Sequence, residues 1–506
     1  MAWLSAVAMF SAAPAHAAWL EAKSNHFIIY ADAPTDVLRD YASRLERFDQ
    51  AVRKLRGMND PALGNSGKVT IYVVGDLDSI QKLIGIGGAA GLYIGRASGA
   101  VAFVPSISTK RPEPGELSSQ TIFFHEYTHH LQLESTTAAL PPWLVEGTAE
   151  FFSTAKIEDD GSVAIGAAAD HRAVGLYLLA PIPLDKLLGD SFTSLTAYSR
   201  ETLYDRGWLL THYLNFEPAR HGELDRYVQL IQQGQQPIDA AGSAFGDLKQ
   251  LDHDLEQYMK RKRLTDVVVP ASALSVGTIS IRPLAPGEAA IMRVRIRSDR
   301  GVTSTSAPDV AAEATDIATR YPDDPAVQTA LAEAEFDAKN FDAAEAAADR
   351  ALAIDPHSRN GLIYKGLARM ERAKTAGGKA DWQEIRSWFV AANRLDPDDP
   401  EPLMRYFETF GAAGEKPPEN AVKGLMYAAA LMPQDAKLRR MATHQLLEQN
   451  DLALARQMFA MIAFDAHVKP ELRSQNQRIM EDITAGNAAA ALTLLDEEAK
   501  QQKNND

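Results

Sequence analysis

Hydrophobic and polar positions follow two different periods along the first hundred residues. Short apolar runs at His26–Tyr30 and Lys68–Val74 are typical of buried strands, and two more strands are expected at Gly91–Ile94 and Gly99–Val104. Between the first two runs, residues 36–56 place apolar side chains three or four positions apart, which predicts an amphipathic helix. Strands interleaved with helices predict an α+β unit.

The pattern then changes twice. Residues 118–263 are mainly helical in pattern, with breaks at the prolines of 141–142 and 181–183. Residues 266–300 contain two β-type runs, Gly277–Arg282 and Ala289–Ile296, which predict a small β-subdomain or linker.

The C-terminal part of the chain is rich in alanine, and prolines end successive predicted helices at regular spacing. These prolines are Pro322, Pro356, Pro397 and Pro433, which lie 34, 41 and 36 residues apart. A helix-turn-helix unit of 34 residues is the tetratricopeptide period, and the longer gap fits an insertion at Lys374–Lys379. We therefore expect an all-α tetratricopeptide-repeat solenoid over residues 308–500.

Length and charge restrict the function. At 506 residues the chain is too long for one hydrophobic core, so several domains are expected. The net charge of -15 argues against nucleic acid as a partner, because binding a polyanion needs a concentrated basic surface. The short basic run Lys260–Arg263 is interpreted as a solvated helix end. No segment beyond the N-terminus has the ~20 apolar residues that an integral membrane segment requires.

The N-terminal residues have features of an export signal. An apolar stretch is followed by Ala15, His16 and Ala17, the small-residue pattern that precedes signal-peptidase cleavage. We predict a signal peptide over residues 1–17, cleavage after Ala17, and a periplasmic or secreted mature protein. The usual positive charges are missing from this stretch, so a plain apolar helix is the alternative.

The absence of cysteine excludes disulfides, thiolate zinc sites and a cysteine nucleophile, so a metal would depend on histidine and carboxylate ligands. An H-E-x-x-H pattern at residues 125–129 supplies such ligands in a stretch free of Gly and Pro. On a helix, His125 and His129 lie one turn apart on one face, so both can reach one ion. Glu126 then lies beside the open coordination position, where it can take a proton from the attacking water.

A second segment, Pro142–Phe152, reads as another helix that carries Glu146 and Glu150 on one face. Two histidines and one glutamate leave the fourth position of a zinc ion open for water, as a catalytic site requires. A structural zinc site fits less well, because such sites are closed by four protein ligands that are often cysteines.

These segments resemble the gluzincins, the thermolysin and aminopeptidase-N-like (peptidase MA-like) superfamily of zinc metallopeptidases. The matches are the H-E-x-x-H motif and a W-L-x-E-G-x-A motif at Trp143–Ala149. The resemblance implies a thermolysin/aminopeptidase-like α+β catalytic domain over residues 18–265 that binds one Zn²⁺. It also implies that Glu146 is the third ligand. Glu150 would accept a hydrogen bond from the free ring N–H of a ligating histidine and so hold its tautomer.

A third segment, Tyr204–Leu210, resembles the Y-x-x-G-x-x-L helix of aminopeptidases. The resemblance implies that the Tyr204 hydroxyl stabilises the oxyanion of the tetrahedral intermediate, with packing on an amphipathic helix as the alternative. His212 competes for this role, although a structural histidine is the simpler interpretation. The resemblance also implies that the strands at residues 91–104 include a substrate-aligning edge strand. Aminopeptidases hold the free N-terminus with a G-x-M-E-N-like segment; none occurs here, which favours an endopeptidase.

The order of segments as a whole resembles a bacterial family of exported peptidases. Three functions stay open. The chain is an exported zinc endopeptidase whose repeats bind a protein partner or the substrate, a catalytically silent peptidase-like scaffold whose repeats bind proteins, or a zinc hydrolase of amide bonds in cell-wall or small-molecule substrates. The intact Glu126 and metal ligands favour an enzyme, since a degenerate site is expected to lose one of them.

Overall fold

The computed structural model describes residues 19–85, 91–107, 118–135, 140–189, 196–375, 380–463 and 470–505. The predicted signal peptide lies outside these ranges, and so do residues 376–379 of the predicted insertion. Within the described ranges, no helix combines the length and apolar character needed to cross a lipid bilayer.

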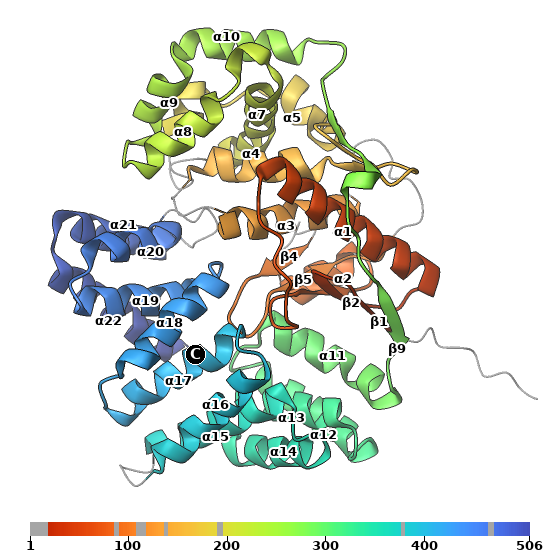
Figure 1. The fold of residues 1–506 in the computed structure, drawn as a ribbon, viewed down its shortest axis with the longest axis vertical. Helices are drawn as coiled ribbons and strands as arrows, with labels where there is room; N and C mark the ends of the chain where they lie inside the picture. Colours follow the sequence, from red (N-terminus) through yellow and green to blue (C-terminus); the bar gives the residue numbers. More distant parts are fainter. Residues whose placement is uncertain are drawn as a thin grey trace, which may run out of the picture.

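The N-terminal part is built on a six-stranded mixed sheet with the strand order β4-β5-β3-β2-β1-β9 (Figure 1). The strands are β1 (Leu20–Lys23), β2 (Phe27–Ala31), β3 (Val69–Val73), β4 (Leu92–Ile94), β5 (Val101–Val104) and β9 (Ser280–Pro283). Strands β2, β3 and β5 are parallel, whereas β4 pairs antiparallel with β5, and β1 pairs antiparallel with both β2 and β9. The four strands predicted between residues 26 and 104 are therefore confirmed.

Different helices bury the two faces of this sheet. They are α1 (Thr35–Arg56), α2 (Leu77–Ile84), α3 (Ser119–Ser135) and α11 (Pro286–Arg300). Ile71 faces the core that includes α1 and α3, and the next residue, Tyr72, faces the core that includes α2 and α11. Successive strand residues point to opposite faces, so a strand covered on both sides is apolar at every position.

The strand predicted at Ala289–Ile296 is wrong, because these residues lie in α11. This helix is buried on two sides. Met292 packs with the residues on the sheet, whereas Ile291 and Val294 pack with the repeat helices that follow. Two apolar stripes separated by arginines give an alternation that imitates a strand.

The other run predicted in this region, Gly277–Arg282, is partly correct, since β9 begins at Ser280 and pairs with β1. A further strand, β8 (Val267–Val269), pairs with β7 (Val163–Ile165) in a separate sheet. The segment 266–300 is therefore divided between two sheets and a helix instead of forming a β-subdomain. Both β9 and α11 lie beyond the predicted end of the N-terminal part at residue 265, yet they complete its sheet and cover it.

The middle of the chain is mainly helical, as predicted. Its helices are α4 (Pro142–Ser153), α5 (Ala173–Leu178), α6 (Leu184–Gly189), α7 (Ala197–Phe216), α8 (Glu223–Gln232), α9 (Pro237–Phe245) and α10 (Leu248–Met259). The sequence analysis missed the short strands β6 (Lys156–Ile157) and β7 (Val163–Ile165), which form an antiparallel sheet with β8.

Helices α4 and α7 cross at two glycines. A Cβ atom on Gly207 would meet the carbonyl oxygen of Trp143 at 2.9 Å and the Cα of Gly147 at 3.2 Å. Only glycine permits two helix backbones to approach this closely. The crossing brings the Glu146 region of α4 beside the part of α7 that carries Tyr204.

The C-terminal part consists of successive helices joined by short turns (Figure 1). They are α12 (Ala307–Arg320), α13 (Pro325–Asp337), α14 (Phe341–Ile354), α15 (Arg359–Thr375), α16 (Trp382–Leu395), α17 (Pro400–Ala413), α18 (Glu419–Leu431), α19 (Ala436–Glu448), α20 (Leu452–Ala463), α21 (Pro470–Ala485) and α22 (Ala488–Asn505). The four prolines that define the period each lie two residues after a helix end. After three of them, an aspartate two residues further on caps the next helix: Asp324, Asp399 and Asp435. The predicted succession of helical repeats in this part of the chain is confirmed.

The repeat helices pack against the N-terminal part instead of extending away from it. Leu425 and Met432 belong to the same hydrophobic core as the sheet residues under α1 and α3. The turn before α19 adds polar contacts, because Asp435 accepts a hydrogen bond from the Ala97 amide at 2.7 Å and Gln434 donates one to the His130 carbonyl at 3.1 Å. The repeats therefore contact α3 directly.

The close crossing of α4 and α7 predicts that Gly207→Ala lowers the free energy of unfolding by about 1–3 kcal/mol, because the added methyl group must push two backbones apart. Denaturant unfolding measures this change. Gly242→Ala on α9 is the control, since a Cβ there meets nothing within 4 Å in the described structure, and it should be neutral or stabilising. Equal effects of the two substitutions would contradict this account of the crossing.

Candidate functional site

Helices α3 and α4 bring three predicted metal ligands together. The Nε2 atoms of His125 and His129 lie 3.3 Å apart, and each is 3.5 Å from the Oε2 atom of Glu146. The two histidines are one turn apart on α3, as the H-E-x-x-H spacing predicts, and Glu146 lies in the first turns of α4. Three donor atoms from two helices thus converge on one point.

The spacing of these donors fits a zinc ion. Ligand atoms arranged tetrahedrally at about 2.0–2.1 Å from zinc lie about 3.3–3.4 Å from one another. The observed separations of 3.3 and 3.5 Å are close to that value and longer than the usual hydrogen bond. His125, His129 and Glu146 could therefore hold one ion and leave a fourth position open.

The charges at the site favour a cation. The Glu146 side chain is fully buried, and burying a carboxylate is costly unless positive charge lies nearby. Burial by itself lowers the pKa of His125, but the carboxylates of Glu146 and Glu150 outweigh this effect and raise the pKa to about 10. Two carboxylates thus stabilise positive charge at His125.

Glu150 lies one turn beyond Glu146 and holds the far side of His125. Its Oε1 atom is 3.2 Å from the His125 Nδ1 atom. Two residues of a short 3₁₀ turn hold the same carboxylate, because His171 Nε2 lies 2.8 Å from Oε2 and Arg172 donates to Oε1 at 2.5 Å. Burial alone raises the pKa of Glu150, but these three partners hold it well below the usual range.

His171 and Arg172 were not predicted from the sequence. They follow Glu150 by 21 and 22 residues, in a segment without a helical or strand period. No spacing rule links a carboxylate to partners in such a turn, so only the fold reveals them.

A different acceptor lies beside the other candidate histidine ligand, His129. The Nδ1 atom of His129 is 3.2 Å from the Oε1 atom of Gln132, whose amide donates to the Val145 carbonyl of α4 at 3.1 Å. In both His125 and His129, an acceptor beside Nδ1 favours the tautomer that is protonated at Nδ1. The lone pair then lies on Nε2, which is the atom that faces the site.

Glu126 and Tyr204 lie at the same site. Glu126 is partly exposed, and its charge contributes to raising the pKa of Tyr204. The Tyr204 ring centre is 6.2 Å from that of His125, and the Arg172 guanidinium carbon is 5.1 Å from the Tyr204 ring centre. Burial, followed by the Glu146 charge, raises the pKa of Tyr204 far above its ordinary value, while Arg172 opposes this shift. The Tyr204 hydroxyl is therefore protonated and able to donate a hydrogen bond.

Two further histidines, His212 and His130, are structural. His212 is fully buried, and its ring nitrogens lie 2.9 Å from the Tyr258 hydroxyl and 2.9 Å from the Gly166 carbonyl oxygen. Both ring nitrogens already have hydrogen-bond partners, which excludes His212 from the oxyanion role. His130 accepts a hydrogen bond at Nδ1 from the Tyr93 hydroxyl of β4 at 2.6 Å. This contact ties the edge strand to the helix that carries the ligands.

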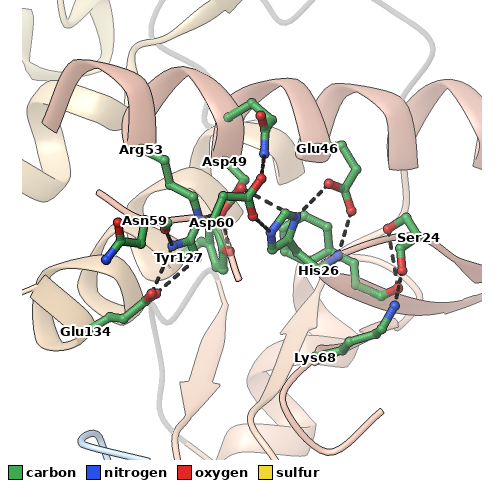
Figure 2. Close-up of polar contacts among 12 residues, drawn as sticks. Ser24, His26, Glu46, Asp49, Arg53, Asn59, Asp60, Lys68, Tyr127 and Glu134 are labelled. Carbon is green, nitrogen blue, oxygen red and sulfur yellow. Dashed lines mark hydrogen bonds and ion pairs between the residues drawn. The ribbon is translucent and has the colours of Figure 1, made fainter. Parts of the chain in front are cut away.

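A second group of potential ligands surrounds His26, which lies beside Glu46, Asp49 and Asp60 (Figure 2). Its Nδ1 atom is 2.7 Å from Glu46 and 3.4 Å from Asp49, and its Nε2 atom is 2.8 Å from Asp60. Both ring nitrogens are therefore within hydrogen-bond distance of a carboxylate, which leaves no room for an ion between them. This group fails the spacing test that the first group passes.

His26 is instead a buried imidazolium. Burial alone lowers its pKa, but the Glu46 hydrogen bond and the Asp49 and Asp60 carboxylates raise it to about 9. The positive ring joins the start of β2 to α1 and to the loop that carries Asp60.

The raised pKa of His26 predicts a loss of stability at alkaline pH. Because its pKa is above the ordinary value of 6.5, the stabilisation is complete below pH 6.5 and is lost as the pH rises towards about 9. The full contribution is up to about 3 kcal/mol. The free energies of unfolding of wild type and His26→Gln should therefore differ most at or below pH 6.5 and converge as the pH rises through about 9.

The matched control is His253→Gln, which replaces an exposed histidine on α10. It should leave the pH dependence of unfolding as in the wild type. The charged groups facing His26 are Glu46, Asp49 and Asp60. Lys68 interacts electrostatically with Glu46. A constant difference between wild type and His26→Gln across this pH range would show that His26 is not a buried imidazolium.

Comparisons with known proteins identify no relative at this site. No protein-family model matches the chain, and no curated protein matches it. Among solved structures, the chain is similar to yeast Tom70, with 14% sequence identity, a TM-score of 0.27, and coverage of 74% of this chain and 75% of Tom70. A likeness this weak carries no conclusion about function, so the functional assignment depends on the site itself.

Proposed function

We propose that this chain is a zinc-dependent metallopeptidase that cleaves peptide bonds. The observation that carries the proposal is the convergence of His125, His129 and Glu146 at separations of 3.3 and 3.5 Å. Zinc bound by these residues would supply a Lewis acid and would lower the pKa of the attacking water. The resemblance to gluzincins in the three motifs is consistent with this chemistry.

Glu126 is the general base in this proposal. It follows the first ligand on α3 and is partly exposed, so it can contact both the attacking water and a bound substrate. Its carboxylate accepts a proton from the water as the water attacks the peptide carbonyl, and it passes this proton to the leaving amine. The peptide C–N bond breaks, and a carboxylate and an amine are released.

Tyr204 stabilises the oxyanion. Its protonated hydroxyl donates a hydrogen bond to the carbonyl oxygen as negative charge develops there. The nearby guanidinium of Arg172 favours that charge, and the α4–α7 crossing holds Tyr204 beside the ligands. Glu150 keeps His125 in the ligating orientation.

The proposal extends to the repeats and to localisation. Tetratricopeptide-like helices present extended surfaces that suit a protein partner or an extended substrate, so we assign the repeats to protein binding. Export to the periplasm or the medium is part of the proposal and depends on the signal-like residues 1–17. An endopeptidase acting on polypeptides is the favoured form.

The proposal predicts that Glu126→Gln retains one equivalent of zinc but loses cleavage of an unfolded protein or mixed peptide library by about 10²–10⁴-fold. Elemental analysis measures the metal, and mass spectrometry of the products measures cleavage. Glu256→Gln, an exposed carboxylate on α10, is the control and should cleave like wild type.

The other outcomes separate the alternatives. Zinc without cleavage in the wild type would favour the peptidase-like scaffold, whose repeats alone act. Cleavage of cell-wall or small-molecule amides, with polypeptides left intact, would favour a zinc hydrolase that acts on those substrates. A wild type that binds no zinc would contradict the proposed site.

A further inference from the structure

The face of α3 opposite the metal ligands is attached to α1 by two polar contacts (Figure 2). The first is Tyr127, which lies between the two histidine ligands in sequence and donates its hydroxyl to Asp49 Oδ1 at 2.8 Å. The second is Glu134, whose two carboxylate oxygens accept from Arg53 at 2.9 and 3.0 Å. Asp49 and Arg53 are themselves paired at 2.8 Å, so the two contacts form one network.

Two contacts separated along a helix restrict its movement more than one does. Tyr127 and Glu134 are seven residues apart, which is about 10 Å along the helix axis. One contact would still permit rotation of α3 about that contact, whereas two fix both its rotation and its position along the axis. Their partners, Asp49 and Arg53, lie one turn apart on α1, so both contacts hold α3 relative to the same helix.

The orientation of α3 matters for the metal ligands. Histidine nitrogens lie near the outer radius of a helix, about 5–6 Å from the axis, so a rotation of about 10° moves them by about 1 Å. The spacing of 3.3 Å between the His125 and His129 nitrogens and of 3.5 Å to Glu146 on another helix depends on that angle.

Apolar packing is poorly suited to fix this angle alone. Phe48 of α1 stacks on Phe124 of α3 with ring centres 3.7 Å apart, and flat apolar contacts tolerate small sliding movements. Hydrogen bonds depend on distance and angle, so they hold a rotation that apolar burial leaves soft. The full burial of the Asp49 carboxylate, a costly arrangement, is explained if it provides such directional contacts.

We propose that Asp49 is a positioning residue of the metal site. It acts through Tyr127 and through the Arg53–Glu134 pair, and it sets the rotation of α3 at which His125 and His129 face Glu146. His26 and Arg53 hold the Asp49 side chain in place from either side. The inference rests on the proposed zinc site and concerns how tightly that site binds metal.

The test compares zinc binding in two variants and a control. Tyr127→Phe removes only the hydroxyl that Asp49 accepts, and Asp49→Asn removes the charge that holds Arg53. Tyr41→Phe is the matched control, because Tyr41 is a buried tyrosine of α1 whose hydroxyl has no hydrogen-bond partner among the described residues. Chelator competition measures the zinc dissociation constant of each full-length protein.

We expect zinc to bind about tenfold more weakly to Tyr127→Phe and up to about 100-fold more weakly to Asp49→Asn, with Tyr41→Phe unchanged. The visible absorption spectrum of the cobalt-substituted proteins should also change in the two variants, because it reports ligand geometry. A purely structural role would lower the melting temperature of the zinc-free protein without changing either readout.

Unchanged zinc affinity and cobalt spectra in Tyr127→Phe, with normal binding by the wild type, would overturn the inference alone. If Asp49→Asn does not fold, Tyr127→Phe decides, since it keeps the charge network intact. A wild type that binds neither metal would instead overturn the proposed site, and with it the inference.

Discussion

The buried carboxylate of Glu146 is the constraint on which the rest of the structure depends. A fully buried negative charge must be compensated, and the groups that face it are two imidazole nitrogens on another helix. These three atoms lie too far apart for short hydrogen bonds and at the separation that a tetrahedral cation needs. Their convergence therefore depends on how α3 and α4 are held relative to each other.

Different contacts hold the two helices that carry the candidate ligands, α3 and α4. Two glycines let α4 lie directly against α7, which brings Glu146 and Tyr204 into one site. Directional polar contacts hold α3 against α1, and α1 is held against the sheet by the buried His26. The repeats add a third support, because the turn before α19 contacts His130, the residue after a ligand. The site is thus connected to all three parts of the chain.

The sequence was most informative where the chemistry is local. The spacing of His125 and His129 follows from helix geometry, and the resemblance of the Trp143–Ala149 motif to gluzincins implied Glu146; the structure brings these three residues together. The repeat period was equally readable, since a proline ends one helix and an aspartate begins the next. Local periodicity failed for α11, where burial on two sides imitates a strand.

Contacts between distant segments could not be predicted. Asp49 and Tyr127 are 78 residues apart, and Glu150 and His171 are 21 apart with a turn and two short strands between them. Nothing in either local sequence identifies its partner, because these contacts depend on how helices are placed in three dimensions. The acidic group at His26 illustrates the same limit, since residue types alone do not distinguish a metal site from a buried imidazolium.

Anomalous diffraction at the zinc absorption edge, from crystals of the zinc-loaded protein, tests the central claim most directly. The account predicts one strong peak at about 2.0–2.1 Å from the Nε2 atoms of His125 and His129 and from a Glu146 oxygen. A peak among His26, Asp49 and Asp60, or no peak between α3 and α4, would contradict it.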